Sequence, residues 1–335
     1  MNQTFKHVQT AHCETGVTHG LLRQIGWEIS EPMLFGIGSG IYFIHLPFIK
    51  VNGVPATSYR IWAGGIFSRV TNLLGLKSTV LKFKDPVEAD HALKALLESG
   101  KSAGIMCSVY YLPYMPDAYR FHFNAHNLLA IGVDGPDYLV SDPILDEVKK
   151  ISAVDLNKAR FAKGFPAPKG KMYYINDSPS GEVPDLRPAI KAGIKRSTFL
   201  INSPPFPFIG ATGPQYLAAR IRKYPKLYNQ RMAFLALGNI VRMQEEIGTG
   251  GGGFRFMYGA FLDEASLLFN NASLKEKALE ITNIGDQWRN FAYETAKVIK
   301  NRSGQTDAFD HIADLLSEVG KREVRFFKDL AKIKL

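Results

Sequence analysis

The fold is decided by the stretch His12-Cys13-Glu-Thr-Gly-Val-Thr-His-Gly-Leu-Leu-Arg-Gln-Ile-Gly26, which predicts a helix that begins at a cysteine. Its apolar residues recur at the helical period and a glycine follows them, as at a typical helix end: Val17, Leu21, Leu22, Ile25 and Gly26. A thiol in a first turn lies beside backbone N–H groups that lack intrahelical partners, at the positive end of the helix dipole. Both effects favour the thiolate, so Cys13 is the candidate nucleophile.

A second stretch predicts a β-hairpin that brings together a histidine and an aspartate: His126-Asn-Leu-Leu-Ala-Ile-Gly-Val-Asp-Gly-Pro-Asp-Tyr-Leu-Val-Ser-Asp142-Pro143. Two apolar runs flank Asp134-Gly135. With a three-residue loop, 133–135, His126 pairs with Asp142 on one face of the sheet, where the carboxylate orients the imidazole. A two-residue turn would shift the register by one and turn Asp142 away. The predicted triad of Cys13, His126 and Asp142 therefore depends on the loop length.

Three parts of the chain resemble a known family. The run from His12 through Glu31-Pro-Met-Leu-Phe-Gly-Ile-Gly-Ser-Gly40 resembles the N-terminal domain of the butirosin-pathway acyltransferase family. That domain is similar to papain-like cysteine peptidases, whose bacteriocin-processing branch has a His, strand, turn, strand and Asp-Pro pattern like the one from His126 to Pro143. The glycine block Glu245-Glu-Ile-Gly-Thr-Gly-Gly-Gly-Gly-Phe-Arg255 looks like the helical domain that accompanies it.

The resemblance implies an enzyme that moves an acyl group in a biosynthetic pathway. The donor would be a phosphopantetheine thioester on an acyl carrier protein, or on CoA, and the group would pass through an acyl-cysteine to a small-molecule amine. No bound cofactor is implied. The papain pattern also has a glutamine six residues before the nucleophile as a side-chain oxyanion donor. His7 stands at that position here and Gln9 lies four residues before Cys13, so both are candidates.

Two other functions use the same residues. A cysteine peptidase or amidase would employ the same triad on a peptide or amide. A non-catalytic binding module would retain the fold, and its Cys13 would react no faster than an ordinary thiol.

Further residues are candidates for contacts with the substrate or the phosphopantetheine arm. His12 adjoins the nucleophile and suits a structural or substrate-contact role. Glu31 either orients a neighbouring group or is a surface carboxylate. The Gly36–Gly40 run suits close packing beside the helix that starts at Cys13, lining an acyl channel. The glycine block before a helix could bind an anion through backbone N–H groups or form a flexible loop. The candidates for these contacts are His12, Glu31, Gly38, Gly251, Gly252, Arg255 and Tyr258.

Composition bounds the remaining possibilities. The chain has 335 residues, 46% of them hydrophobic and 21% charged, which is typical of a globular protein. Two cysteines make no disulfide framework, and no metal-binding spacing is present. Cys107 lies in an apolar run and is predicted to be a core thiol. The formal net charge of +10 either favours acidic partners, of which an acyl carrier protein is one, or serves solubility alone; no nucleic-acid motif appears. Without a signal-peptide core or a spanning segment we expect a cytoplasmic protein, and leave open whether it forms a homo-oligomer.

The chain divides into two predicted domains. Residues 1–178 mix helices with later strands, the α+β order of a papain-like domain. The patterns in this part predict a buried strand or helix pair over 34–49, a helix that Asp85-Pro86 opens and that runs to about Glu98, a strand over 105–112 and a short helix that begins at Ser152. A segment dense in turn formers, 176–184, is the linker. Residues 185–335 carry successive amphipathic helical patterns and predict a helical bundle.

Overall fold

The computed structural model describes residues 5–176, 181–301 and 306–335. It divides into two compact units, Met1–Leu34 with Ala63–Asp185, and Phe35–Trp62 with Leu186–Leu335. The second unit therefore contains residues 35–62, which the prediction of a boundary at the linker assigned to the first domain. The expected end of the first domain, position 178, lies outside the described residues.

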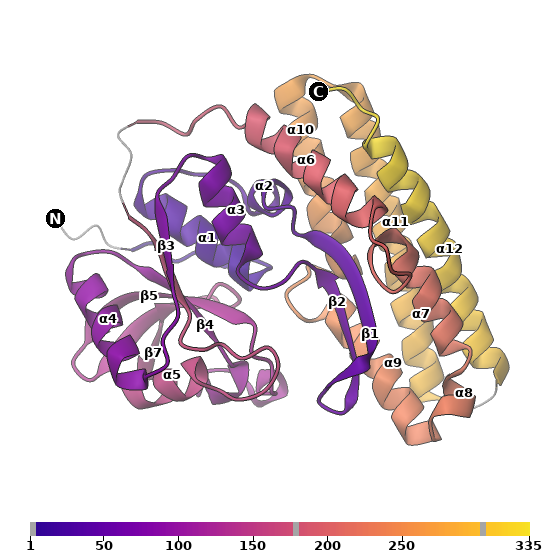
Figure 1. The fold of residues 1–335 in the computed structure, drawn as a ribbon, viewed down its shortest axis with the longest axis horizontal. Helices are drawn as coiled ribbons and strands as arrows, with labels where there is room; N and C mark the ends of the chain where they lie inside the picture. Colours follow the sequence, from indigo (N-terminus) through magenta and orange to yellow (C-terminus); the bar gives the residue numbers. More distant parts are fainter. Residues whose placement is uncertain (1–4, 177–180, 302–305) are drawn as a thin grey trace. The chain divides into compact units, whose positions relative to one another are not determined.

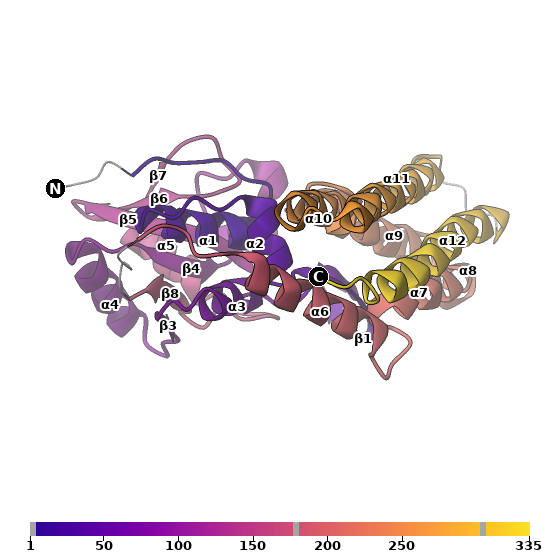
Figure 2. The ribbon, with the colours of Figure 1, turned by 90° about the horizontal axis from the view of Figure 1, so that it is seen from above.

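The first unit is built on a six-stranded sheet with the order β3-β8-β4-β5-β6-β7, and each neighbouring pair is antiparallel. Figure 2 shows the strands succeeding one another in this order. The strands are β3 (Ser78–Leu81), β4 (Ala103–Cys107), β5 (His126–Asp134), β6 (Asp137–Ser141), β7 (Lys149–Ser152) and β8 (Met172–Ile175). The helices of this unit are α1 (Cys13–Gln24), α3 (Gly65–Leu73), α4 (Pro86–Glu98) and α5 (Ala153–Arg160). A further helix, α2 (Glu31–Ile37), begins in the first unit and ends in the second.

Local capping explains where these helices begin. The Asp85 side chain accepts hydrogen bonds from two backbone N–H groups at the start of α4, and Pro86 occupies the first turn. Ser152 caps α5 in the same way. Both helices were predicted, and the structure confirms them. The strand predicted for residues 105–112 instead spans Ala103–Cys107, because the chain then enters a 3₁₀ turn.

The two faces of this sheet are covered by different helices (Figure 1). One face carries the core shared with α4 and α5, in which Leu128 and Ala130 of β5 and Cys107 of β4 are fully buried. The predicted core position of Cys107 is thereby confirmed. Leu129 faces the other side, toward α1: a Cβ added at Gly20 would lie 2.8 Å from its side chain. Helix α1 therefore packs on the face opposite α4 and α5.

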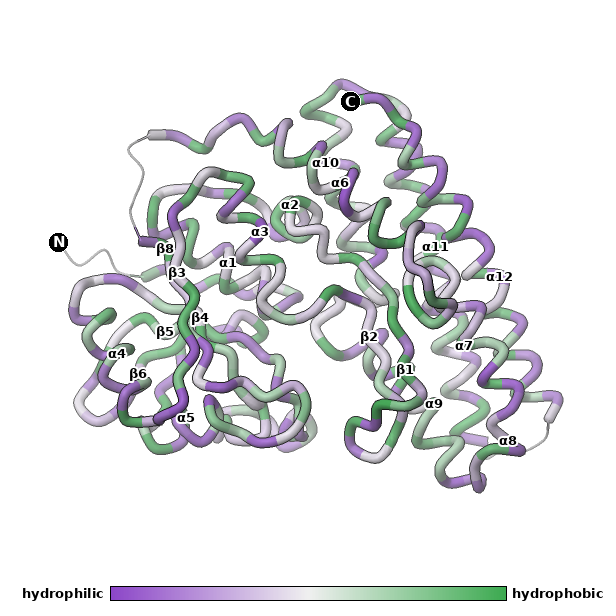
Figure 3. The backbone as a smooth tube through the Cα atoms, viewed as in Figure 1, coloured by the Kyte–Doolittle hydropathy of each residue, from purple (hydrophilic) through white to green (hydrophobic). Residues whose placement is uncertain are grey.

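The second unit combines a two-stranded hairpin with helices. The hairpin is β1 (Ile41–Val51) and β2 (Val54–Arg60). Residues 34–49, for which a buried strand or helix pair was expected, hold the end of α2 and most of β1, which is buried at every second residue in its first half. The helices are α6 (Arg187–Asn202), α7 (Gly213–Ile221), α8 (Tyr224–Leu227), α9 (Gln230–Glu245), α10 (Arg255–Phe269), α11 (Ala272–Lys300) and α12 (Thr306–Leu330). Helix α12 packs against α7 and α11. Along α12, Figure 3 shows hydrophilic and hydrophobic residues alternating, as in a helix with one buried face. The predicted fold class, an α+β unit accompanied by a helical one, is confirmed.

Candidate active site

Cys13 is the first residue of α1, and the residue is 7% exposed. His12 is the N-cap: its backbone is extended and its Nδ1 accepts the Thr15 N–H at 3.4 Å. This capping makes Cys13 the first helical residue after the irregular segment that precedes it. His12 thus has the structural role that was one of its two predicted alternatives.

The segment before Cys13 is held by Glu31. The Glu31 carboxylate accepts the backbone N–H groups of Ala11 at 2.9 Å and of His12 at 2.7 Å, and the Thr15 hydroxyl at 2.8 Å. Three donors on one carboxylate restrict the path of the chain into the helix. Glu31 therefore orients the segment that carries the nucleophile, rather than lying as a solvated surface charge.

His126 and Asp142 form a buried pair beside Cys13. The distance from His126 Nε2 to Asp142 Oδ2 is 2.8 Å, and the Cys13 thiol is a further hydrogen-bonding partner of His126. Burial opposes a charge on His126, but the Asp142 carboxylate and Cys13 outweigh burial and raise the pKa of His126 to about 10. The Tyr114 hydroxyl donates to Asp142 Oδ2 at 3.0 Å. The site can therefore hold an imidazolium between a carboxylate and a sulfur.

The hairpin reaches this geometry by a register that differs from the predicted one. The turn has two residues, 135–136, with Asp134 opposite Asp137, rather than a three-residue loop. An irregularity between Ala130 and Gly132 adds one further residue to β5. Relative to the predicted register, the turn shifts the pairing by three residues and the bulge takes one back, so the net shift is two residues and the facing of β5 is kept. In this register Leu129 pairs with Ser141, so Asp142 is a diagonal neighbour of His126 on the same face.

Both predicted side-chain oxyanion donors are engaged with the segment after β6. His7 Nε2 donates to the Leu145 carbonyl at 2.9 Å, and its Nδ1 is hydrogen-bonded to the Ser141 hydroxyl at 2.7 Å. Gln9 donates to the Ile144 carbonyl at 3.2 Å. These hydrogen bonds connect the segment before α1, at His7 and Gln9, with the loop that carries Asp142. They support the position of the triad aspartate.

Sequence reasoning missed two residues beside the nucleophile. The Asn127 amide lies 3.8 Å from Cys13 Sγ. Its signal in the sequence was only a polar residue within an apolar strand, next to His126. Glu14 is fully buried and accepts the N–H groups of Ile66 and Phe67 at 2.8 and 3.3 Å, which joins α1 to the first turn of α3. A carboxylate in a helix's first turn is common, so nothing in the sequence marked Glu14.

The remaining predicted contact residues lie in the second unit and are bonded internally. The Gly251 N–H donates to Thr249 Oγ1 at 3.0 Å, and the Gly252 N–H donates to the Glu245 carboxylate at 3.1 Å. A carboxylate of the protein thus occupies the position expected for a bound anion. These bonds describe a folded turn, in which Gly251 and Gly252 adopt positive φ angles of 86° and 57°.

Arg255 and Tyr258 of the helix that follows are core residues. Arg255 is 1% exposed, forms a two-point ion pair with Glu323 at 2.6 and 3.0 Å, and donates to the Gly253 carbonyl. Tyr258 is fully buried. Gly38 lies in the turn after α2, where neighbouring Gly36 packs against the Phe261 ring of the same unit. The glycine run therefore belongs to the packing of the second unit.

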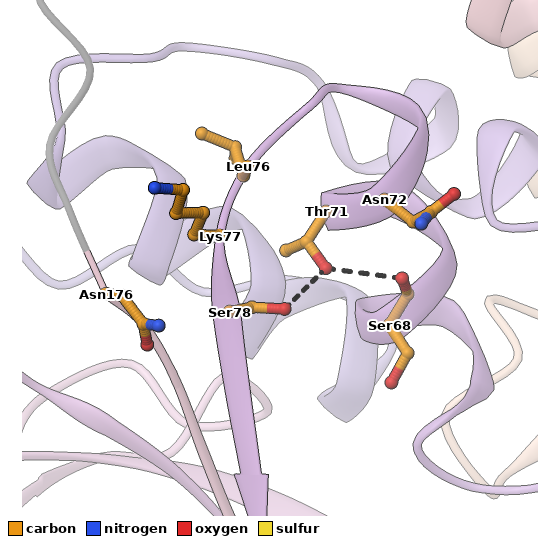
Figure 4. Close-up of a pocket in the computed structure, with 7 residues that line it drawn as sticks. All are labelled: Ser68, Thr71, Asn72, Leu76, Lys77, Ser78 and Asn176. Atoms are coloured by element: carbon orange, nitrogen blue, oxygen red, sulfur yellow. Dashed lines mark hydrogen bonds between the residues drawn. The ribbon is translucent and has the colours of Figure 1, made fainter.

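The first unit has a hollow that none of the triad residues lines (Figure 4). It is formed where α3 ends and β3 begins, and polar side chains line most of it, with a hydrogen bond between Thr71 and Ser78. None of the predicted site residues lines this hollow. Within residues 5–176, 181–301 and 306–335, no group of three or more His, Cys, Asp or Glu side chains could hold a metal ion. Among the described helices, none combines the length and the hydropathy that crossing a membrane requires.

A cysteine at a helix start, a histidine on an antiparallel strand and an aspartate that binds the histidine define a nucleophilic cysteine centre. Together with the match of residues 12–143 reported below, they indicate a cysteine-dependent enzyme.

The chain belongs to the family described as "Domain of unknown function (DUF4872)", whose model matches residues 154–330. Residues 12–143 match the family described as "Butirosin biosynthesis protein H, N-terminal", which confirms the resemblance seen in the sequence. None of the curated proteins matches the chain. Among solved structures, a putative C39-like peptidase from Bacillus anthracis is similar at 15% identity over 52% of this chain and 95% of its own, with a TM-score of 0.37.

Proposed function

We propose that the protein transfers an acyl group from a phosphopantetheine thioester to an amine through an acyl-Cys13 intermediate. One observation carries the proposal: Cys13, at the start of α1, is hydrogen-bonded to His126, which is bonded to Asp142 at 2.8 Å. The match of residues 12–143 to a butirosin biosynthesis protein supports biosynthetic acyl transfer over peptide cleavage. An acyl carrier protein is the donor we favour, because the chain is basic and an acidic partner complements its charge.

The first half-reaction forms the acyl-enzyme. The Cys13 thiolate attacks the thioester carbonyl carbon, and the backbone N–H of Cys13 stabilises the oxyanion that develops. The carbon–sulfur bond to phosphopantetheine breaks as the His126 imidazolium donates its proton to the departing sulfur. The products are acyl-Cys13, a neutral His126 and the free carrier thiol. A raised His126 pKa keeps this acid charged in the resting enzyme.

The second half-reaction consumes the acyl-enzyme. The neutral amine attacks the acyl carbon, and His126 accepts a proton from the nitrogen. Collapse of the tetrahedral intermediate forms the amide and restores the thiolate and the imidazolium. Asp142 stabilises the charge on His126 in the resting enzyme and again after the amide has formed. Thioester exchange is nearly balanced in energy, whereas amide formation is favourable, so the amine drives the cycle forward.

Intact-protein mass spectrometry after mixing with an acyl-loaded carrier protein tests the proposal. We expect a mass increase of one acyl group, located on Cys13 and absent from Cys13→Ala, while Cys107→Ala, which alters the other, core cysteine, retains it. Adding a primary amine should discharge the adduct as an amide. An unmodified protein with carrier and CoA thioesters alike, or equal amide formation by Cys13→Ala, would contradict acyl transfer. Cleavage of a peptide without any thioester would assign the same triad to a peptidase.

A further inference from the structure

The side chain of Asn127 is held in one orientation. It is fully buried in β5, and its Nδ2 donates to the Ala125 carbonyl at 3.1 Å. A carbonyl only accepts hydrogen bonds, so the nitrogen rather than the oxygen must lie on that side. On the other side, Oδ1 accepts the Tyr173 hydroxyl at 2.9 Å. The two bonds agree, and together they fix which end of the amide is the donor.

The donor end faces the nucleophile. Nδ2 lies 3.8 Å from Cys13 Sγ, a distance at which a sulfur atom accepts an N–H. A thiol is a weak acceptor, whereas a thiolate carries a full charge and accepts far more strongly. The amide therefore favours the ionised form of Cys13. His126 favours the same form, but through a group that itself gains and loses a proton during the proposed reaction.

The position of Tyr173 is determined from several sides. Gly104 on β4 leaves room for its ring, because an added Cβ there would lie 2.2 Å from it. The Phe67 ring of α3 packs on it with a centroid distance of 4.5 Å. Glu14, the residue after the nucleophile, binds the Ile66 and Phe67 N–H groups. Contacts therefore connect α1 with α3, α3 with Tyr173, Tyr173 with Asn127, and Asn127 with Cys13 at the start of α1.

We infer that Asn127 is a permanent hydrogen-bond donor to the Cys13 thiolate, and that Tyr173 is the positioning residue that keeps the amide nitrogen directed at sulfur. The inference deepens the proposed function, since it assigns a further residue to the same nucleophile. The amide has no proton to exchange at ordinary pH. It stabilises the thiolate both before His126 donates its proton and when the acyl group leaves.

Other groups near Cys13 also act on its ionisation, and the experiment must separate them from Asn127. Cys107 of β4 interacts electrostatically with Cys13, and burial, together with Asp142 and Cys13, raises the pKa of its thiol well above the usual value. The titratable side chains near the nucleophile, on its own and neighbouring elements, include His126, Asp142, Tyr114, Cys107, His12, Glu14 and Glu31. Each of them stays unchanged in the variants below.

Alkylation of Cys13 by iodoacetamide, measured from pH 4 to 10, tests the assignment, because alkylation reports the thiolate and forms no oxyanion. The midpoint is the pH at which the alkylation rate reaches half of its maximum. In Asn127→Leu, which removes the donor, we expect this midpoint to rise by about one pH unit, which corresponds to a tenfold loss of thiolate at any pH below the midpoint. Asn127→Asp should raise it further by placing an acceptor beside sulfur. Tyr173→Phe should shift it in the same direction by less, since the amide can then turn.

Asn124→Ala is the matched control. Asn124 is also a buried asparagine, and its Nδ2 donates to the Lys163 carbonyl at 3.0 Å, so its loss tests for a general effect of removing a buried amide. We expect its midpoint to match that of the unaltered protein. Circular dichroism identifies any variant that does not fold, and Tyr173→Phe, which retains the buried ring, then carries the test.

Two results would overturn the inference. One is an unchanged midpoint in folded Asn127→Leu and Tyr173→Phe. The other is unchanged alkylation with impaired acyl transfer, which would make Asn127 an oxyanion donor instead. Because the assay contains no acyl donor, failure of the proposed function appears separately: shifted midpoints with no acyl adduct would refute acyl transfer and leave this assignment standing.

Discussion

Replacing Asp142 with asparagine should remove the charge that keeps His126 protonated. Asp142 is fully buried, and its Oδ2 is shared by His126 Nε2 at 2.8 Å and the Tyr114 hydroxyl at 3.0 Å. An amide oxygen in the same place can accept from both groups, but it carries no charge. If the amide nitrogen faces His126, the imidazole must adopt the tautomer that presents an acceptor to it, which changes the protonation of the nitrogen nearer Cys13.

The size of the effect follows from the pKa of His126. This pKa rises from an ordinary 6.5 to about 10 although burial alone would lower it, so Asp142 and Cys13 together raise the proton affinity by more than about 10³, or by at least about 5 kcal/mol. Without the carboxylate, we expect His126 to lose its proton near or below neutral pH. By analogy with other triads, the rate of acyl transfer should fall by about 10²–10⁴.

The assay is the pH profile of amide formation, with the His126 imidazole signals followed by NMR. In the unaltered protein the imidazolium should persist to about pH 10. Since its folded-state pKa is raised, its contribution to the free energy of unfolding is complete below pH 6.5 and is lost as the pH rises through about 10. Asp142→Asn should lower this upper limit. A variant with an unchanged rate and an imidazolium that survives above pH 9 would refute the reasoning.

Three further variants test how the scaffold holds its parts. Glu31→Ala removes the acceptor of three hydrogen bonds and should lower the free energy of unfolding, measured by urea denaturation, by about 2–3 kcal/mol. Alkylation of Cys13 should also become slower. A variant as stable and as reactive as the unaltered protein would contradict the role of this carboxylate. Arg255→Ala leaves the buried Glu323 without its counter-ion, with the Trp288 N–H still donating to it, and should cost about 3–5 kcal/mol. Apolar replacement of both Arg255 and Glu323 should recover most of the loss; equal losses would argue against the buried charge as the cause. Gly104→Ala should cost about 1–3 kcal/mol, because the new Cβ would lie 2.2 Å from the Tyr173 ring, and an unchanged melting temperature would show that the ring moves freely.

Some features followed from local sequence because their causes are local. The helix at Cys13 was predicted from apolar spacing and a terminal glycine, and α1 spans Cys13–Gln24 with Gly26 in the left-handed region. Aspartate before proline predicted the start of α4. Capping and helical periodicity involve residues within a few positions of one another, so no distant contact is needed to read them.

The hairpin that carries His126 could be predicted only in part from the local sequence. Its strands and its turn were predicted from alternating apolar runs around Asp134-Gly135, but its register was not. The bulge near Ala130 and Gly132 compensates the shorter turn, and so His126 still meets Asp142. Which residue bulges depends on how the side chains of β5 pack on the helices at both faces, and that packing is a property of the assembled unit.

The sequence by itself thus determined the nucleophile's helix, the order of elements and the residues able to form a triad. Only the tertiary structure decided the partners of isolated polar groups. It gave Gly252 the Glu245 carboxylate, engaged His7 with the loop after β6, and turned Asn127 toward Cys13. A buried polar side chain must find a partner, and the available partners lie far away in the chain, so their identity emerges when the elements pack together.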